Sequence, residues 1–247
     1  MIMPLTSNSA APALEHPGCS SSGRIETVSI HEGVDTSRPG NDERARTNRT
    51  TSFKIASTRH EWEAALGLVY RVYVRSGLIR TNRHQVRVIP HHALPSTEVL
   101  IAAEGNKILG TLSIVGDGEL GLPMETIYAE EVEQLRRQRL RIAEVSCLAE
   151  GQDESSQSFS MISRLMAMTA QCASRRGIDQ LLIAVHPRHV KFYERFLAFE
   201  VIGGQRTYVS VCDHPAVAMA MDLKSLSFDH PRAYRRLYGV PFDDDHL

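Results

Sequence analysis

Glu144 is the residue whose type and position most directly suggest chemistry. It lies in the apolar segment 142–149, which is typical of a β-strand. A carboxylate in the middle of such a strand is costly to bury alone, so it must face a wet cleft or meet a partner. In a cleft it can act as a general base or anchor an incoming amine. With an arginine from 71–83 it would form a structural ion pair instead.

Strand alternation divides this segment between two faces. The apolar face, expected in the core, comprises Ala143, Val145, Cys147 and Ala149. The opposite face comprises Ile142, Glu144, Ser146 and Leu148. On this assignment the carboxyl of Glu144 and the hydroxyl of Ser146 share one side of the strand.

Two further residues offer acid–base chemistry, and each has a structural alternative. His186 closes the apolar segment 181–186 and could relay a proton, although a histidine at a strand end more often makes local hydrogen bonds. Tyr193 lies in the helical segment 188–197 and could protonate a leaving thiolate, or could belong to a core stripe. That stripe would comprise Val190, Tyr193, Phe196 and Leu197.

The segment 116–121 matches the pattern G-x-G-x-x-G, which in some folds holds a dinucleotide pyrophosphate. Three observations argue against that function. The strand before the segment belongs to a hairpin, Asp117 and Glu119 would repel a pyrophosphate, and Pro123 interrupts the start of the next helix. We therefore interpret the segment as an acidic loop.

Hydrophobic periodicity predicts the elements that must position these residues. Strands are expected at 53–56, 99–103, 108–115, 142–149, 181–186, 201–202 and 217–221. Helices are expected at 61–75, 124–138, 159–176, 188–197 and 232–238, and a loop at 80–92. Residues 1–50 show no sustained periodicity and are expected to form a disordered leader. The order predicts an α/β (α+β) domain over 51–224, followed by a helical tail over 225–247.

Composition limits the class of protein. The chain has 247 residues, 42% hydrophobic and 23% charged, and its net charge of −1 gives no indication of nucleic-acid binding. Its four cysteines lie far apart with no C-x-x-C pair, which argues against a metal cluster or a disulfide framework and fits a reducing cytosol. The N-terminus lacks a continuous apolar run, so we expect a cytoplasmic protein without integral membrane association.

Three segments together resemble a known family. They read YRVYVRSGLI (70–79), IAEVSCLA (142–149) and HPRHVKFYERFLAFEVIGGQRTY (186–208). In these segments the chain resembles the FeeM-like long-chain N-acyl amino acid synthases, which are GNAT-fold relatives of the acyl-homoserine lactone synthases. The resemblance implies a GNAT-type mixed central sheet with splayed parallel strands and helices on both faces.

The resemblance also implies acyl transfer from acyl carrier protein to the α-amine of an amino acid. The thioester would lie between the strands 142–149 and 181–186, and a backbone amide near Ser146 to Leu148 would stabilise the oxyanion. Glu144 would accept the proton of the amine. The catalytic candidates are Glu144, Ser146, His186 and Tyr193. The candidates for substrate binding are Arg71, Tyr73, Arg75, Cys147, Leu148, Phe159 and Met166.

Either Arg71 or Arg75 would hold the substrate carboxylate, because a guanidinium matches it in two hydrogen bonds. The acyl chain would run along the helix 159–176. The segment 80–92 shows no motif that identifies the amino acid, so the acceptor is left open.

The loop after strand 142–149 bears on the acyl donor. Most GNAT enzymes carry there a Gln/Arg-x-x-Gly-x-Gly/Ala loop that cradles the pyrophosphate of coenzyme A. In this chain 149–158 has three acids and a single glycine, which favours a carrier protein whose acyl-phosphopantetheine is a co-substrate, with no bound cofactor and no metal. Cations available to an acidic carrier surface are Arg136, Arg137, Arg139, Arg188 and Lys191, unless they are only solvated.

Two other classes of protein stay open. One is a different enzyme on the same fold, namely an acyl-homoserine lactone synthase or a coenzyme A-dependent N-acetyltransferase. The other is a non-catalytic module that binds an acyl chain or a carrier protein.

Overall fold

The computed structural model describes residues 51–151 and 158–243, without the side chains of residues 158 and 159. The predicted leader, 1–50, and most of the predicted acidic loop after strand 142–149 lie outside the described residues. No helix in the described parts of the chain is long and apolar enough to span a membrane.

A seven-stranded mixed sheet organises the described chain, in the order β1-β2-β3-β4-β5-β7-β6. The β4–β5 pair is parallel and the other pairs are antiparallel. The predicted mixed sheet is therefore confirmed. The strands are β1 Ser52–Ile55, β2 Thr97–Glu104, β3 Lys107–Gly116, β4 Ile142–Glu150, β5 Gln180–Val185, β6 Glu200–Tyr208 and β7 His214–Asp222.

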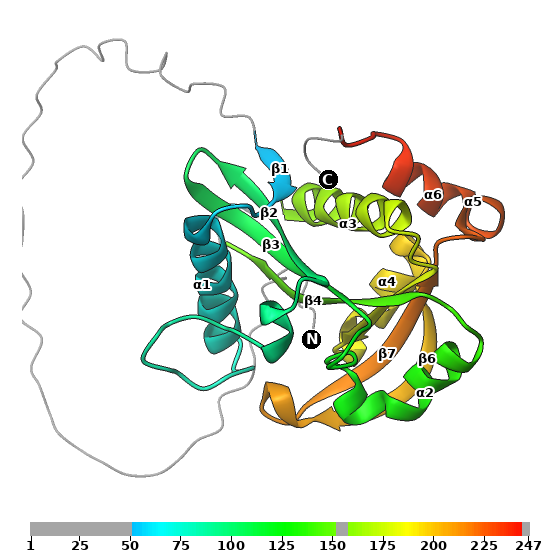
Figure 1. Ribbon diagram of the computed structural model, residues 1–247, viewed down its shortest axis with the longest axis horizontal. Helices are drawn as coiled ribbons and strands as arrows, with labels where there is room; N and C mark the ends of the chain where they lie inside the picture. Colours follow the sequence, from blue (N-terminus) through cyan, green and yellow to red (C-terminus); the bar gives the residue numbers. More distant parts are fainter. Residues whose placement is uncertain (1–50, 152–157, 244–247) are drawn as a thin grey trace, which may run out of the picture. The chain divides into compact units, whose positions relative to one another are not determined.

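Helices cover both faces of the sheet, as predicted (Figure 1). One apolar core lies under α1 and α2, and the other lies under α3, α4 and α6. The α-helices are α1 Arg59–Arg75, α2 Glu125–Arg137, α3 Ser158–Arg175, α4 Val190–Leu197, α5 Leu226–Asp229 and α6 Pro231–Tyr238. Short 3₁₀ helices are η1 Pro90–Ala93, η2 Pro187–His189 and η3 Val209–Val211.

Helix α1 begins at Arg59, two residues before the predicted start at residue 61, because a capping box fixes its first turn. Thr58 Oγ1 accepts a hydrogen bond from the backbone N–H of Glu61 at 3.2 Å, and Glu61 Oε2 accepts one from the backbone N–H of Thr58 at 3.1 Å. The helix buries Val69, Val72 and Tyr73 against the sheet. This phase decides which α1 side chains can reach the centre of the domain.

Strands β4 and β5 pair for only part of their length. The register joins Ile142, Ala143 and Glu144 to residues 180–182, although β4 continues to Glu150. Over its whole length β5 pairs with β7, and beyond Glu144 β4 pairs only with β3. Each strand thus keeps one bonded neighbour while the edges that face each other separate. The predicted splay begins directly after Glu144.

A β-bulge at Cys147 changes the side-chain pattern of β4. The residue has a φ of 54°, and Ser113 and Thr111 of β3 face Ser146 and Ala149, so two steps on β3 correspond to three on β4. Past the bulge the faces exchange. Leu148 lies in the core that contains Ala143 and Val145, and Cys147 and Ala149 lie in the opposite core. The predicted alternation was therefore wrong beyond Ser146.

The closing hairpin is longer than predicted. The sequence indicated strands at 201–202 and 217–221, whereas β6 runs from Glu200 to Tyr208 and β7 from His214 to Asp222. Most β6 side chains are exposed, so β6 lacks the apolar run by which a buried strand is recognised.

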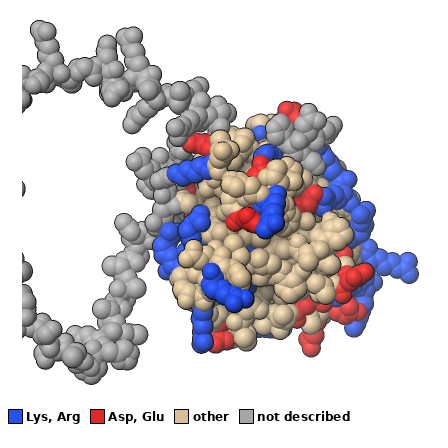
Figure 2. Space-filling view, turned by 60° about the vertical axis from the view of Figure 1, so that its left-hand side comes forward, with Lys and Arg blue, Asp and Glu red and all other residues tan. Residues whose placement is uncertain are grey.

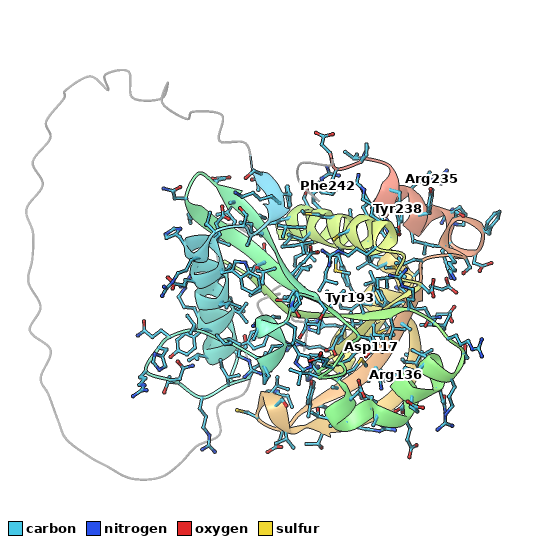
Figure 3. The ribbon with its side chains drawn as sticks, viewed as in Figure 1. Asp117, Arg136, Tyr193, Arg235, Tyr238 and Phe242 are labelled. Atoms are coloured by element: carbon cyan, nitrogen blue, oxygen red, sulfur yellow. The ribbon has the colours of Figure 1, made fainter. Side chains whose placement is uncertain are left out.

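The C-terminal tail is fastened across α3 through a buried amide. Gln171 Nε2 donates to the carbonyl oxygens of Leu237 at 2.7 Å and Val240 at 3.1 Å, and Gln171 Oε1 accepts from the backbone N–H of Phe242 at 2.9 Å. The guanidinium of Arg164 lies 3.8 Å from the centroid of the Phe242 ring. Figure 3 shows Phe242 beside α3.

Replacing Gln171 with Ala should lower the free energy of unfolding by about 2 kcal/mol, because the buried carbonyl of Leu237 and the buried N–H of Phe242 lose their partner. Urea denaturation followed by circular dichroism measures the change. The matched control is Gln134→Ala on the exposed side of α2, which should stay within about 0.5 kcal/mol of the unmodified protein. Equal stability of the two variants would contradict the role of the tail contact.

Candidate active site

Glu144 is a buried carboxyl at the point where β4 and β5 separate. It is 1% exposed, and its Oε2 accepts a hydrogen bond from the backbone N–H of Met124, directly before α2, at 2.7 Å. Its Oε1 has no partner within the described residues. Burial raises the pKa of Glu144 to about 7, against the lowering effect of the Met124 N–H. The group can therefore exchange a proton near neutral pH.

No ion pair joins Glu144 to an arginine in the described ranges, so the structural alternative finds no support there. The lack of a cationic partner also explains why the pKa of Glu144 is raised. A guanidinium beside the carboxylate would lower the pKa, whereas burial without such a partner raises it.

Two tyrosines are buried, one in each core of the domain. Tyr73 of α1 is 1% exposed, and burial together with the nearby thiol of Cys147 raises its pKa well above the ordinary value. Tyr193 of α4 is fully buried, its hydroxyl has no partner within the described residues, and burial raises its pKa strongly. Figure 3 shows Tyr193 near the centre of the sheet. Both phenols therefore keep their protons at neutral pH and can donate.

Ser146 and its neighbours form a polar row on the α1 side of the sheet. The hydroxyl of Ser146 donates to Sγ of Cys147 at 3.8 Å, and Ser146 faces Ser113 of β3 in the register. His92 Nδ1 accepts from the backbone N–H of Ile89 at 3.2 Å, so its Nε2 carries the proton and donates to Ser113 Oγ at 3.1 Å. Burial and the charge of a nearby arginine, Arg87, lower the pKa of His92 to about 4, so it is neutral.

Sequence reasoning missed Arg87, which lies in the segment 80–92 that was expected to form a loop. Its Nη2 donates to the carbonyl oxygen of Ser210 at 3.2 Å, and its buried Nε has no partner within the described residues. Its charge lowers the pKa of both Cys147 and Tyr208, although burial raises each overall. The only signal in the sequence was an arginine between two valines, Val86 and Val88.

Tyr208, also missed, connects Arg87 with Glu144. Its hydroxyl donates to the carbonyl oxygen of Pro123 at 3.0 Å. Besides burial, the carboxyl of Glu144 raises the pKa of Tyr208, and Arg87 lowers it. Pro123 precedes Met124, whose N–H binds Glu144, and Ser210, which binds Arg87, lies two residues after Tyr208. Tyr208 thus joins the segments that hold the two charges.

Arg71 and Arg75 lie away from this centre. Both are exposed, on the side of α1 opposite to Val69 and Tyr73. The expectation that one of them holds the substrate carboxylate thus conflicts with the phase of the helix, whereas Tyr73 does face the bulge.

His186 matches its structural alternative. Its Nδ1 accepts a hydrogen bond from the backbone N–H of Arg188 at 3.2 Å, which caps η2, and burial lowers its pKa. Of the predicted acyl contacts, Leu148 and Met166 are fully buried in the core under α3. The side chain of Phe159 lies outside the described residues.

The predicted basic residues divide between the two ends of β4. Arg136, Arg137 and Arg139 precede its first residue, whereas Arg188 and Lys191 follow β5, at the end where the strands separate. Except for Arg136, they are exposed.

Arg136 is engaged in holding a loop. It donates to Asp117 Oδ1 at 2.7 Å and to Glu125 Oε2 at 2.8 Å, and both carboxylates raise its pKa. Figure 3 shows Asp117 and Arg136 side by side. The segment 116–121 is thus an acidic loop closed by an arginine, as interpreted.

Unpaired buried polar atoms are rare in folded proteins and indicate where a ligand can bind. In 51–151 and 158–243 such atoms belong to Arg87, His91, Thr97, Glu144, Gln180 and Tyr193. Of these residues, Arg87 and Glu144 both influence the pKa of the Cys147 thiol at the bulge. The same ranges contain no group of three or more His, Cys, Asp or Glu side chains that could hold a metal.

Comparison with known families identifies the one to which the chain belongs. The model of the family N-acyl amino acid synthase FeeM matches residues 64–222. The chain belongs to the FeeM family. It is an acyltransferase, as the resemblance implied. No curated protein sequence matches it.

Solved structures agree with this assignment. FeeM, an N-acyl amino acid synthase from uncultured soil microbes, is 28% identical, with a TM-score of 0.64 over 72% of this chain and 93% of that chain. The acyl-homoserine lactone synthase LasI is 16% identical, with a TM-score of 0.57 over 79% and 97%. BjaI, a coenzyme A-dependent acyl-homoserine lactone synthase solved with SAM and isopentyl-CoA, is 17% identical, with a TM-score of 0.58 over 78% and 92%. The last two share the fold.

The raised pKa of Glu144 predicts how stability depends on pH. The folded protein binds this proton more tightly than the unfolded chain, so the contribution to stability is complete below about pH 4.5 and is lost as the pH rises through about 7. Glu144→Gln cannot ionise. Relative to the unmodified protein it should gain about 3 kcal/mol between pH 4.5 and 8.5.

Urea denaturation at pH 4.5, 7 and 8.5 measures this difference. Glu130→Gln, on the exposed side of α2, removes the same charge and should follow the unmodified protein at every pH. Parallel pH curves for Glu144→Gln and the unmodified protein would show that Glu144 titrates normally.

Proposed function

We propose that this protein transfers a long-chain acyl group from the thioester of acyl carrier protein to the α-amine of an amino acid, which yields an N-acyl amino acid. One observation carries the proposal. The parallel strands β4 and β5 separate directly after a buried carboxyl whose pKa is about 7. The match to the N-acyl amino acid synthase family over 64–222 supports it.

The thioester arm would lie in the gap between the strands. Beyond Glu144 the facing edges of β4 and β5 are not bonded to each other, so they can offer backbone groups to a bound arm. The segment Ser146–Leu148, where the bulge turns the backbone, would supply an amide to the oxyanion of the tetrahedral intermediate.

The reaction needs one group to accept a proton from the amine and another to protonate the leaving thiolate. An amino acid is mainly an ammonium at neutral pH, and Glu144 would take one proton to release the amine. The nitrogen then attacks the carbonyl carbon, the C–N bond forms, and the C–S bond breaks. As the intermediate collapses, its nitrogen loses the second amine proton to water, and the thiolate gains a proton from Tyr193. Solvent then restores the proton of Tyr193 and takes up the proton held by Glu144.

Surface charge bears on the choice of donor. On the face seen in Figure 2, Lys and Arg side chains lie in separate groups with Asp and Glu beside several of them. A carrier protein would therefore meet a local group of cations. Arg188 and Lys191 follow the end of β5 at the open side of the gap, which suits a partner that inserts its arm there. The free thiols of Cys147, Cys172 and Cys212 fit a cytoplasmic location.

The direct test supplies donors and acceptors in parallel. Long-chain acyl carrier protein, long-chain acyl-coenzyme A and acetyl-coenzyme A are each incubated with the common amino acids or with S-adenosylmethionine, and products are identified by mass spectrometry. We expect N-acyl amino acids from the acyl carrier protein. Lactone formation, acetyl transfer, or binding of the carrier protein without product would each contradict the proposal.

Glu144→Gln should reduce turnover about a hundredfold or more, because it removes the base. In the unmodified enzyme kcat should rise with pH through about 7, as the carboxyl ionises. Stopped assays between pH 5.5 and 9 measure both effects. A folded Glu144→Gln enzyme with a near-normal rate would exclude the role of general base.

The docking site is tested by charge reversal at the two ends of β4. Arg188→Glu with Lys191→Glu should raise the KM for acyl carrier protein about tenfold. The KM for a short acyl-pantetheine thioester should not change. The control pair, Arg137→Glu with Arg139→Glu, should leave both values unchanged. If only the pair Arg137→Glu with Arg139→Glu raised the KM for acyl carrier protein, the carrier protein would bind at the opposite end of β4.

A further inference from the structure

A cavity of about 260 Å³ lies between the segment 78–88 and the turn after β6. Ligand sites for drug-sized molecules are larger, about 300–1,000 Å³. This volume suits a smaller ligand such as an amino acid. The residues that line the cavity include Ile79, Arg80, Val86, Arg87, Val88 and Val209.

We propose that this cavity is the acceptor site, where Arg87 binds the α-carboxylate and the exposed valines on its two sides contact an apolar side chain of the amino acid. The inference rests on the proposed function. It adds the residue that selects an amino acid, and the class of amino acid.

Arg87 is held in place from two sides and still has donors to offer. Its backbone N–H donates to the carbonyl oxygen of Leu66 in α1, and its Nη2 donates to the carbonyl oxygen of Ser210 in η3. Its buried Nε has no partner within the described residues. A fixed guanidinium in the lining of a cavity is suited to a carboxylate, because it offers several N–H donors in a rigid plane.

The loop that carries Arg87 is ordered by its own hydrogen bonds. Asn82 Nδ2 donates to the carbonyl oxygen of Val86 at 3.0 Å, and Asn82 Oδ1 accepts from the backbone N–H of His84 at 3.0 Å. The loop therefore closes on itself next to Arg87. Little ordering is then required when a ligand binds.

The cavity is linked to the reaction centre by a short series of hydrogen bonds. Arg87 donates to the carbonyl oxygen of Ser210, and Tyr208, two residues earlier, donates to the carbonyl oxygen of Pro123, which precedes Met124. The backbone N–H of Met124 binds Glu144, so the segments that hold Arg87 and the base are joined. An α-amino acid needs this arrangement, because its amine is two bonds from the carboxyl carbon.

The walls indicate the side chain of the acceptor. Val88 is 56% exposed and Val209 is 76% exposed, one on each side of the cavity. A ligand with an apolar side chain would cover both and gain free energy from the buried area. Arg80, a second guanidinium in the lining, would repel the cationic side chains of lysine and arginine.

The experiment compares L-leucine with L-leucinamide, which lacks only the carboxylate, in the full chain with long-chain acyl carrier protein. The unmodified enzyme should prefer leucine. Arg87→Ala should raise the KM for leucine about 10- to 150-fold, which corresponds to one hydrogen bond to a charged group. The kcat should stay within a few-fold, and the preference over leucinamide should disappear. Arg83→Ala, an exposed arginine of the same loop, is the matched control.

Two further variants keep the inference open to refutation if Arg87→Ala does not fold. Arg87→Lys should give an intermediate KM, and Val209→Trp, at an exposed position, should raise the KM by filling the cavity. Leucine and phenylalanine should outcompete lysine as acceptors. An unchanged KM in Arg87→Ala or Val209→Trp, or a preference for lysine, would overturn the inference.

Calorimetric binding of leucine separates this inference from the proposed function. Binding that depends on Arg87, without any acyl transfer, would retain the acceptor site and refute the transfer reaction. Acyl transfer to leucine that is unaffected by Arg87→Ala would retain the reaction and refute the site.

Discussion

The separation of β4 from β5 after three paired residues is the constraint on which the rest of the site depends. It arises because each strand pairs on its far side, β4 with β3 and β5 with β7, and because the bulge at Cys147 turns β4 out of step. Unpaired strand edges inside a protein are costly. They are therefore informative, because a bound substrate can pair with them.

The buried carboxyl of Glu144 lies at the position where this gap begins. One hydrogen bond from the Met124 backbone holds it without neutralising it, so burial brings its pKa close to physiological pH. A salt bridge would have made the domain more stable and the carboxyl a weaker base. The site thus shows the usual conflict between stability and function, with the destabilising group placed where the chemistry occurs.

Sequence reasoning located the strands and helices with long apolar patterns, and it located Glu144 at the correct strand. It missed the bulge, since a single residue with positive φ leaves no trace in the run IAEVSCLA. It missed Arg87 because the partner, Ser210, is 123 positions away. The sequence could have shown that Arg71 lies on the exposed side of α1, because Val69 and Tyr73 set the phase of the helix.

The cavity beside Arg87 has walls that come from a loop after α1 and from the turn of the last hairpin, and none of its lining residues belongs to β4 or β5. Insertions or substitutions in such segments are tolerated far better than changes inside a sheet. Divergence within a lineage of these enzymes could therefore alter one substrate preference while the handling of the other substrate stays the same.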